Sequence, residues 1–280
     1  MLSAYYRLTK PGIIYGNSLT AIAAFFLASK DVFHPGLFVA MLAGVALSIA
    51  AGCVLNNLLD RGIDELMPRT QNRRQILNQT GTRNAVIFAV ILAAVGLAIL
   101  FWFTNTLTML VVLSGILLYV GVYTPLKVRT LHAATIGTLP GAVSILAGFT
   151  AVTGRIGWEG LILFLIMVIW QLPHFYAIAI YRLRDYQAAH VPVLPAEKGI
   201  RYTKLSIIVL IVLYLVSASM LYVFRFVGWR YLAVVGILGL YWLAMAFRGL
   251  NTPDTGLWAR RMYRFSLILL LVFSIMIGVS

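Results

Sequence analysis

Three oxygen-bearing side chains stand four residues apart in the first third of the chain: Asn56, Asp60 and Asp64. On a helix this spacing stacks them on one face, one turn above the next. The chain contains only 8 acidic residues, and two of them stand here at the end of a long apolar run. Carboxylates at the edge of hydrocarbon are costly unless they bind something. The spacing therefore predicts a site that holds a metal ion through oxygen ligands, with Mg²⁺ the expected ion.

Basic side chains follow this acidic motif at short range and recur in later loops. A diphosphate leaving group gathers negative charge as its bond to carbon breaks, and fixed cations stabilise that charge. The cations that we expect to contact a diphosphate are Arg69, Arg73, Lys127, Arg129, Arg184 and Lys198. The alternative interpretation is that these residues only set the orientation of the chain in the membrane, because the inner loops of membrane proteins carry Lys and Arg in any case.

A second acidic segment, around Asp185, follows another apolar run much later in the chain. We expect Asp185 to complete the metal site from the opposite half of the molecule. The expected metal ligands are then Asn56, Asp60, Asp64 and Asp185, and the three aspartates among them are the expected catalytic residues. The alternative is a weak local ion pair between Asp185 and its neighbouring arginines.

One histidine, His174, lies within an apolar run, in the sequence Gln171-Leu172-Pro173-His174-Phe175. A histidine at this depth could ligate heme iron, shuttle a proton or simply hydrogen-bond a carbonyl group. The residue types alone leave these three roles open.

Long apolar segments must position these residues, because 61% of the 280 residues are hydrophobic and 11% are charged. With a mean hydropathy of +0.94, the chain carries more apolar surface than a soluble domain could bury. Runs of about 17–25 apolar residues have the length of a membrane-crossing helix. The expected spans are 12–30, 36–59, 84–103, 107–124, 133–151, 158–181, 204–224, 229–247 and 262–279. We therefore predict an all-α polytopic membrane protein, a single domain over residues 1–280, with nine transmembrane helices around a central cavity.

The 22 Lys and Arg residues give a net charge of +14 and are distributed unevenly over the loops. All lie in the N-terminal tail or in loops on the same side as that tail, except Lys30, Arg155, Arg225 and Arg230. This asymmetry is the positive-inside pattern of membrane proteins. It predicts that the N-terminus and both acidic segments face the cytoplasm, and it explains the basic character without nucleic acid as a partner.

Taken together, these motifs resemble the intramembrane prenyltransferase superfamily. The resemblance rests on the pattern Asn-x-x-x-Asp-x-x-x-Asp at the end of an early span, with a distant aspartate after a later one. Within the superfamily, the chain is similar to the branch of protoheme IX farnesyltransferases. The stretches with this narrower likeness are Thr9-Lys10-Pro11-Gly12, Ala151-Val152-Thr153-Gly154, Gln171-Leu172-Pro173-His174-Phe175-Tyr176 and the segment 184–195. The chain departs from the family pattern at Val143-Ser144-Ile145, where a proline pair is usual, and at Ala196-Glu197-Lys198-Gly199.

The resemblance implies that a farnesyl group passes from farnesyl diphosphate to a vinyl group of heme b. Water then adds, and the products are heme O and diphosphate. The resemblance also implies Mg²⁺ as cofactor, His174 as a heme-binding residue, and a role in heme biosynthesis for terminal oxidases at the bacterial inner membrane. The expected partners are farnesyl diphosphate, heme b, membrane lipid, and proteins that handle heme or assemble terminal oxidases.

Two other functions share part of this pattern. A prenyltransferase for a quinone-type aromatic ring would use the same metal motif, but related enzymes repeat an acid where this chain has Ala189. Ala189 and His174 therefore favour heme. A transporter or channel would also explain buried acids and a basic inner face, but it predicts acids spread over the membrane depth. Here the three aspartates all stand at the inner ends of spans.

Overall fold

A computed structural model describes residues 2–29, 32–68 and 70–279. Within these residues, nine helices are long and apolar enough to cross a membrane. They are α2 (Pro11–Ala28), α3 (Pro35–Leu59), α6 (Thr82–Phe103), the span Thr106–Leu126, α9 (Ala133–Thr153), α10 (Gly157–Tyr181), α13 (Ile200–Val223), the span Trp229–Asn251 and α15 (Thr255–Gly278). The predicted all-α, multi-pass membrane fold is therefore confirmed.

The remaining elements are short. The fourth span consists of α7 (Thr106–Leu117), the π-helix η1 (Leu118–Tyr123) and α8 (Thr124–Leu126), and the eighth of α14 (Trp229–Arg248) and the 3₁₀-helix η2 (Gly249–Asn251). Outside the spans lie α1 (Leu2–Leu8), α4 (Arg61–Leu66), α5 (Gln71–Thr80), α11 (Leu183–Ala188) and α12 (Leu194–Glu197). The two long segments between spans, 60–81 and 182–199, thus contain short helices that can hold side chains in place.

Local sequence signals explain where several spans begin and end. Pro11 and Pro35 stand in the first turns of α2 and α3, where a proline leaves no hydrogen bond unmade. Asn105 caps α7, since its side chain accepts a hydrogen bond from Thr108 N at 2.8 Å. Gly154 ends α9 in the left-handed conformation with φ of 63°.

Two spans begin at least four residues earlier than the hydropathy pattern predicted. The seventh begins at Ile200 rather than 204, and the ninth begins at Thr255 rather than 262. Asp254 caps α15 by accepting a hydrogen bond from Leu257 N at 2.8 Å, so the helix starts well before the apolar run. The hydropathy pattern locates only the apolar part of a helix, whereas the capping residue determines where the helix begins.

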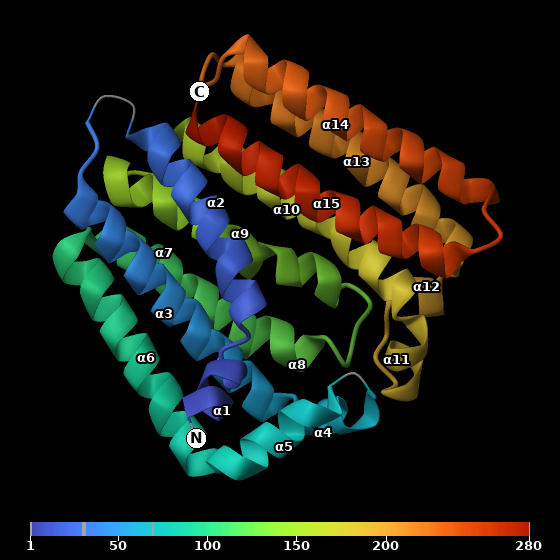
Figure 1. Cartoon of the computed structure of the whole chain (residues 1–280), viewed down its shortest axis with the longest axis horizontal. Helices are drawn as coiled ribbons and strands as arrows, with labels where there is room; N and C mark the ends of the chain where they lie inside the picture. The colour runs from blue at the N-terminus through green and yellow to red at the C-terminus, as the bar shows by residue number, and fades with distance from the viewer. Residues whose placement is uncertain (1, 30–31, 69, 280) are drawn as a thin grey trace.

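The spans pack in a ring that closes where α15 contacts α2 (Figure 1). One apolar core joins α10, α13, α14 and α15, and contains Ile166, Tyr214, Trp242 and Phe273. A second core lies among α2, α3, α6, α7 and α9. Figure 1 shows α1, α4, α5 and α11 along one edge of the bundle, opposite the C-terminal end of α15. Both acidic segments therefore lie at the same end of the bundle.

Candidate active site

Asn56, Asp60 and Asp64 are all buried, with 2%, 3% and 5% of their surface exposed. The helix α3 ends at Leu59, yet the backbone keeps the helical register beyond it. Asp60 N donates to Asn56 O at 2.9 Å, and Asp64 N donates to Asp60 O at 2.8 Å. The predicted stack of three oxygen-bearing side chains is therefore formed, across the junction of α3 and α4.

Each rung of this stack contacts one cation from a different part of the chain. Lys10 Nζ donates to Asn56 Oδ1, and Lys127 Nζ forms a salt bridge with Asp60 Oδ2. Arg73 Nη1 lies 3.4 Å from Asp64 Oδ1. We call these three pairs the acid–cation ladder. Asp60 and Asp64 are thereby paired with cations, as charges at the edge of a membrane core should be, whereas Asn56 offers Lys10 a neutral amide oxygen.

The side-chain amide of Asn56 has a defined orientation. Asn56 Nδ2 donates to Thr124 Oγ1 at 2.9 Å, and Thr124 Oγ1 donates to the carbonyl oxygen of Tyr119 at 2.8 Å. The hydroxyl proton of Thr124 is used in the second bond, so its oxygen must accept from an N–H of the amide. The Asn56 oxygen therefore faces Lys10. Tyr119 lies in the π-helical turn η1, a local irregularity that is frequent at functional sites.

The oxygens of the ladder fit Mg²⁺ in kind and number. Asp60 Oδ2 is held by Lys127, whereas Asp60 Oδ1 is buried without a hydrogen-bond partner among the described residues. A buried carboxylate oxygen with no partner is costly, and a cation would satisfy it. Mg²⁺ typically takes one or two protein carboxylates and completes its shell with phosphate oxygens and water.

Lys10 is a cation of the candidate site that the sequence analysis did not assign. It directly precedes the first span and has a left-handed backbone conformation with φ of 52°. Burial, together with the nearby charge of Arg73, lowers the pKa of Lys10 from 10.5 to about 8. The available signal was its place in the Thr9-Lys10-Pro11-Gly12 stretch, where a proline begins the helix.

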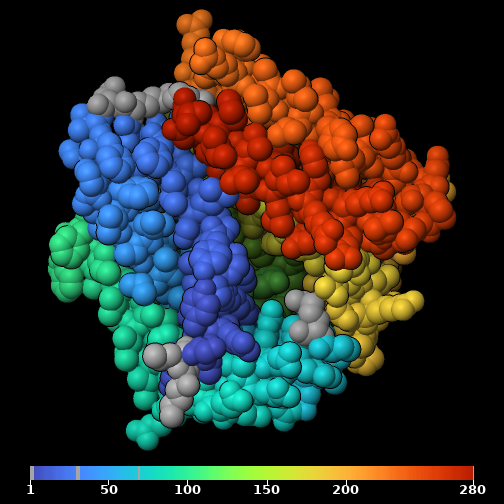
Figure 2. Space-filling model, in the orientation of Figure 1, coloured from blue at the N-terminus to red at the C-terminus, as the bar shows by residue number. Residues whose placement is uncertain are grey.

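The ladder adjoins a large cavity inside the bundle. The cavity has a volume of about 840 Å³, towards the upper end of the range of small-molecule pockets, roughly 300–1,000 Å³. Arg7, Lys10 and Arg73 line one part of it, and mostly apolar side chains line the rest. Its walls come from α2, α3, the fourth span, α9, α10 and α15, whereas α6, α13 and α14 contribute none of the described lining residues. Figure 2 shows the molecule hollowed between α2 and α15, with atoms from the middle of the chain inside.

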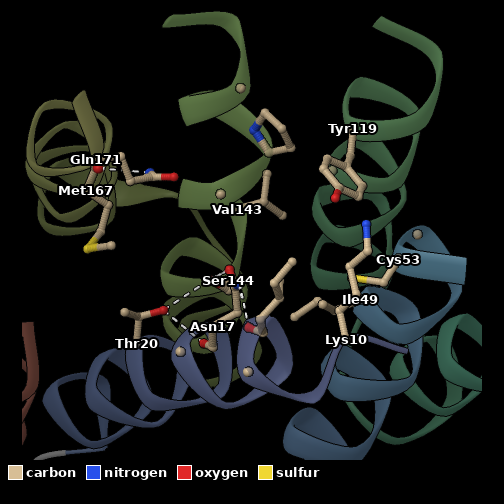
Figure 3. Close-up of a pocket in the computed structure, with 18 of the residues that line it drawn as sticks. Lys10, Asn17, Thr20, Ile49, Cys53, Tyr119, Val143, Ser144, Met167 and Gln171 are labelled. Atoms are coloured by element: carbon tan, nitrogen blue, oxygen red, sulfur yellow. Dashed lines mark hydrogen bonds between the residues drawn. The ribbon is translucent and has the colours of Figure 1, made fainter. Parts of the chain in front are cut away.

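A polar cluster interrupts the apolar wall between α2 and α9. Ser144 Oγ donates to Asn17 Oδ1 at 2.9 Å and lies 3.0 Å from Thr20 Oγ1 (Figure 3). Ser144 belongs to the segment that departs from the family pattern. In Figure 3, Lys10 extends towards Tyr119 on another side of the cavity. The cavity thus combines a cationic side with a separate neutral polar patch.

His174 lines the same cavity from α10, as its expected role requires. It is 8% exposed, and its Nδ1 lies 2.7 Å from Ser266 Oγ of α15. The imidazole stacks against Trp170 at 5.1 Å between ring centroids, and the ring of Tyr263 lies at the same distance. The hydrogen-bond partner of the imidazole is therefore the hydroxyl of Ser266, whereas the sequence analysis considered a carbonyl group.

Asp185 lies in α11, whose segment packs against the first acidic segment. Ile63 and Met67 share an apolar cluster with Tyr186 and Val191. Asp185 Oδ2 also lies 3.9 Å from Arg182 Nη1, the local pair considered as the alternative. Within the described residues, no three His, Cys, Asp or Glu side chains form a ready-made metal site. The part of Asp185 in a shared metal site therefore stays a prediction.

The other predicted cations fall into separate groups. Arg69 lies outside the described residues. Arg129, Arg184 and Lys198 are exposed. Lys198 lines a second hollow of about 370 Å³, whose lining also includes His132. Among the described members of the predicted set, the structure therefore brings Arg73 and Lys127 into the ladder and leaves the diphosphate contacts of the others as predictions.

Comparisons with known proteins identify the family and the fold. A family model described as the UbiA prenyltransferase family matches residues 17–270. The protoheme IX farnesyltransferase of Protochlamydia amoebophila (strain UWE25) is 46% identical over 277 residues, which cover 99% of this chain and 98% of that protein. A solved structure of digeranylgeranylglyceryl phosphate synthase matches with a TM-score of 0.82 at 19% identity, over 99% of this chain and 97% of that one. A UbiA homolog from Archaeoglobus fulgidus bound to DMAPP and Mg²⁺ matches with a TM-score of 0.71 at 16% identity, over 99% of both chains. At these identities the structural likeness concerns the fold.

Proposed function

The chain belongs to the UbiA prenyltransferase family, and we propose that it transfers a farnesyl group from farnesyl diphosphate to a vinyl group of heme b. Water adds to the product carbon, and heme O and diphosphate are formed. The relative at 46% identity bears the name of this activity, which supports heme as the acceptor. In this proposal the whole chain, residues 1–280, acts as one integral-membrane domain.

The observation on which the proposal depends is the acid–cation ladder beside an apolar cavity. A prenyl diphosphate has a highly charged head and a long hydrocarbon chain. The head matches Lys10, Arg73 and Lys127, which lie at the ladder, and the chain matches the apolar walls. The cavity has a volume of about 840 Å³, towards the upper end of the range for small-molecule pockets, which suits a site for a long prenyl chain.

We assign the diphosphate end of the reaction to the ladder and its neighbours. Arg73 and Lys127 hold the diphosphate, with Arg69, Arg129, Arg184 and Lys198 as further contacts from the segments around them. Asn56, Asp60, Asp64 and Asp185 would hold Mg²⁺ in this proposal, and the bound ion would supply positive charge that offsets the repulsion between these carboxylates and the diphosphate. Fixed cations stabilise the negative charge that develops as the carbon–oxygen bond breaks. Arg73 and Lys127 would do so with little reorganisation, because salt bridges to Asp64 and Asp60 already hold them.

The apolar part of the cavity suits the carbon–carbon bond-forming step. Loss of diphosphate leaves an allylic cation, and the electron-rich vinyl group of heme attacks it. Trp170, Tyr119 and Tyr263 line the cavity, and ring faces attract cations. Exclusion of water protects the cation until the bond to heme has formed. Orientation of both substrates in one cavity lowers the entropic part of the barrier.

The cellular setting follows from charge and from the family. The ladder end of the bundle contains most of the Lys and Arg residues, so we propose that it faces the cytoplasm of a bacterial cell from the inner membrane. Farnesyl diphosphate would reach the cavity from that side, and heme from the membrane or from a heme-handling protein. Proteins that assemble terminal oxidases are the proposed recipients of the product.

One reconstitution experiment tests the proposal. Purified protein in lipid is incubated with farnesyl diphosphate, heme b and Mg²⁺, and the porphyrin is analysed by mass spectrometry. We expect a product that has gained one farnesyl group and one hydroxyl group, with one proton of the water released, and we expect it to be absent after chelation of the metal and absent for Asp60→Asn. An aromatic quinone precursor as sole acceptor tests the rival substrate. Prenylation of that ring with unmodified heme would overturn the proposal, as would ion flux in liposomes without any transfer to heme.

A further inference from the structure

Two consecutive hydrogen bonds connect α10 to α15 at the wall of the cavity. His174 Nδ1 lies 2.7 Å from Ser266 Oγ, and Ser266 Oγ lies 2.7 Å from the carbonyl oxygen of Tyr263. A serine hydroxyl has one proton to donate, and a carbonyl oxygen has none. Two oxygens at 2.7 Å, the usual O–H···O distance, require that proton between them. Ser266 therefore donates to Tyr263, and its oxygen accepts the proton of His174 Nδ1.

This arrangement determines which nitrogen of His174 is protonated. No carboxylate contacts the imidazole among the described residues, and an unpaired charge at this depth of the membrane would be costly. A neutral imidazole with its proton on Nδ1 has its lone pair on Nε2. The hydrogen bond of His174 found among the described residues is made by Nδ1, and Nε2 is not among the fully buried atoms without a partner, while His174 lines the cavity. The imidazole of His174 therefore presents a basic Nε2 to the cavity, while the bond from Nδ1 to Ser266 fixes the ring.

We propose that Ser266 is a positioning residue that holds His174 with the Nε2 lone pair directed to the iron of the heme acceptor. This inference rests on the proposed function. Metal-bound histidines almost always donate their second N–H to an oxygen, which fixes the ring and raises the basicity of the ligand. The Nδ1–Ser266–Tyr263 relay is such an arrangement, formed before heme binds. Coordination of the iron would fix the porphyrin in the cavity and limit which vinyl group meets the farnesyl chain.

A merely structural role for Ser266 makes different predictions. Ser266 is fully buried, and a hydroxyl between two helices can simply improve their packing. Loss of such a bond would weaken the binding of any porphyrin equally. Loss of a positioning bond would weaken the binding of heme alone, because only heme has an iron to coordinate. Iron-free protoporphyrin IX is therefore the discriminating probe.

The experiment compares Ser266→Ala with Ser274→Ala in purified full-length protein. Ser274 is also buried on α15, and its Oγ has no hydrogen-bond partner among the described residues, so its loss should be silent. Ferric heme b and protoporphyrin IX are titrated separately, and binding is followed by absorption spectra. We expect Ser266→Ala to weaken heme binding by about 10- to 100-fold while protoporphyrin IX binds as in the wild type. Equal weakening for both porphyrins, or none for heme, would overturn the proposal.

A second measurement applies even where Ser266→Ala fails to fold. We expect the wild-type heme spectrum to show a histidine ligand, His174→Gly to lose it, and added imidazole to restore it. An unchanged spectrum in His174→Gly would overturn the inference. The proposed function fails separately: histidine-ligated heme without any farnesylated product would contradict the transfer reaction but not the ligand. Farnesylated heme from a protein whose spectrum ignores His174 would contradict the ligand but not the reaction.

Discussion

Lys127 Nζ forms a salt bridge with Asp60 Oδ2 across 67 positions of the sequence, while Asp60 Oδ1 is left buried and without a hydrogen-bond partner among the described residues. One carboxylate thus divides its two oxygens between a cation of the protein and the position where a ligand cation would bind. Lys127 is therefore held at the acidic motif, whereas the nearby Arg129 is exposed. The pair connects the fourth span to the acidic motif of the second.

Replacement of Lys127 by Met should lower farnesyl transfer by at least about 100-fold, because one fixed donor at a developing negative charge is worth that much. Lys127→Arg keeps the charge and should retain more activity than Lys127→Met. Initial rates at saturating Mg²⁺ provide the measurement. Arg155→Met is the matched control, since Arg155 is exposed in the short connection between α9 and α10. A Lys127→Met enzyme with wild-type rate would remove Lys127 from the diphosphate site.

Thr124 fixes the amide of Asn56, so its hydroxyl should influence the metal requirement. Thr124→Val removes the acceptor for Asn56 Nδ2 and lets the amide rotate, whereas Thr124→Ser keeps it. We expect Thr124→Val to raise the Mg²⁺ concentration for half-maximal rate by about 10-fold, in line with other outer-shell metal partners. Thr124→Ser should behave like the wild type. The same metal requirement in both variants would mean that the Asn56 oxygen does not face the ion.

The lowered pKa of Lys10, about 8, gives the enzyme a pH dependence. As pH rises through about 8, the folded protein loses this charge at the cavity, and the KM for farnesyl diphosphate should rise. Lys10→Arg should keep a lower KM to higher pH, because arginine stays protonated. Steady-state rates across this pH range, in both proteins, are the measurement. Parallel KM profiles would contradict a role for Lys10 in binding the diphosphate.

The lowered pKa of Lys10 also affects the stability of the protein, which should rise with pH while substrate binding weakens. Between about pH 8 and 10.5, an unfolded Lys10 binds more protons than a folded one. The free energy of unfolding therefore rises with pH in this window. Lys10→Met should remove that part of the rise. Thermal unfolding at several pH values checks it, and an identical slope in both proteins would count against the lowered pKa.

The sequence was sufficient for the fold and for the helical stack of Asn56, Asp60 and Asp64, whereas the part of Asp185 in the site stays a prediction. Apolar runs of membrane length predicted the nine spans, because the bilayer imposes both their length and composition. The four-residue spacing predicted the stack of Asn56, Asp60 and Asp64, because helical register is a local property. Family membership, too, was predicted from these motifs and is confirmed by the match over residues 17–270.

The cationic side of the site could not be predicted in the same way. The contacts of Lys10 with Asn56 and of Lys127 with Asp60 join residues 46 and 67 positions apart. Such contacts depend on how the spans pack, and every inner loop carries Lys and Arg for topological reasons. Arg74 illustrates the ambiguity, since it follows the acidic motif closely yet pairs with Glu65. Ser266 gave no signal, because a serine in an apolar span usually bonds its own helix.

The close approach of α2 to α9 should be needed both for stability and for the shape of the cavity. A Cβ atom on Gly148 would lie 2.0 Å from the backbone oxygen of Ala21, so Gly148→Ala must push the two helices apart. We expect it to destabilise the protein by about 1–3 kcal/mol, the usual cost of overpacking. Gly236 in α14 has no neighbouring atom within 4 Å of such a Cβ, and Gly236→Ala should be neutral or stabilising by roughly 0.5–1 kcal/mol. Thermal unfolding of both variants in the same lipid tests this. Asn17 of α2 and Ser144 of α9 lie at this helix contact, so Gly148→Ala should also slow farnesyl transfer. If Gly148→Ala is as stable and as active as Gly236→Ala, this helix contact does not define the cavity.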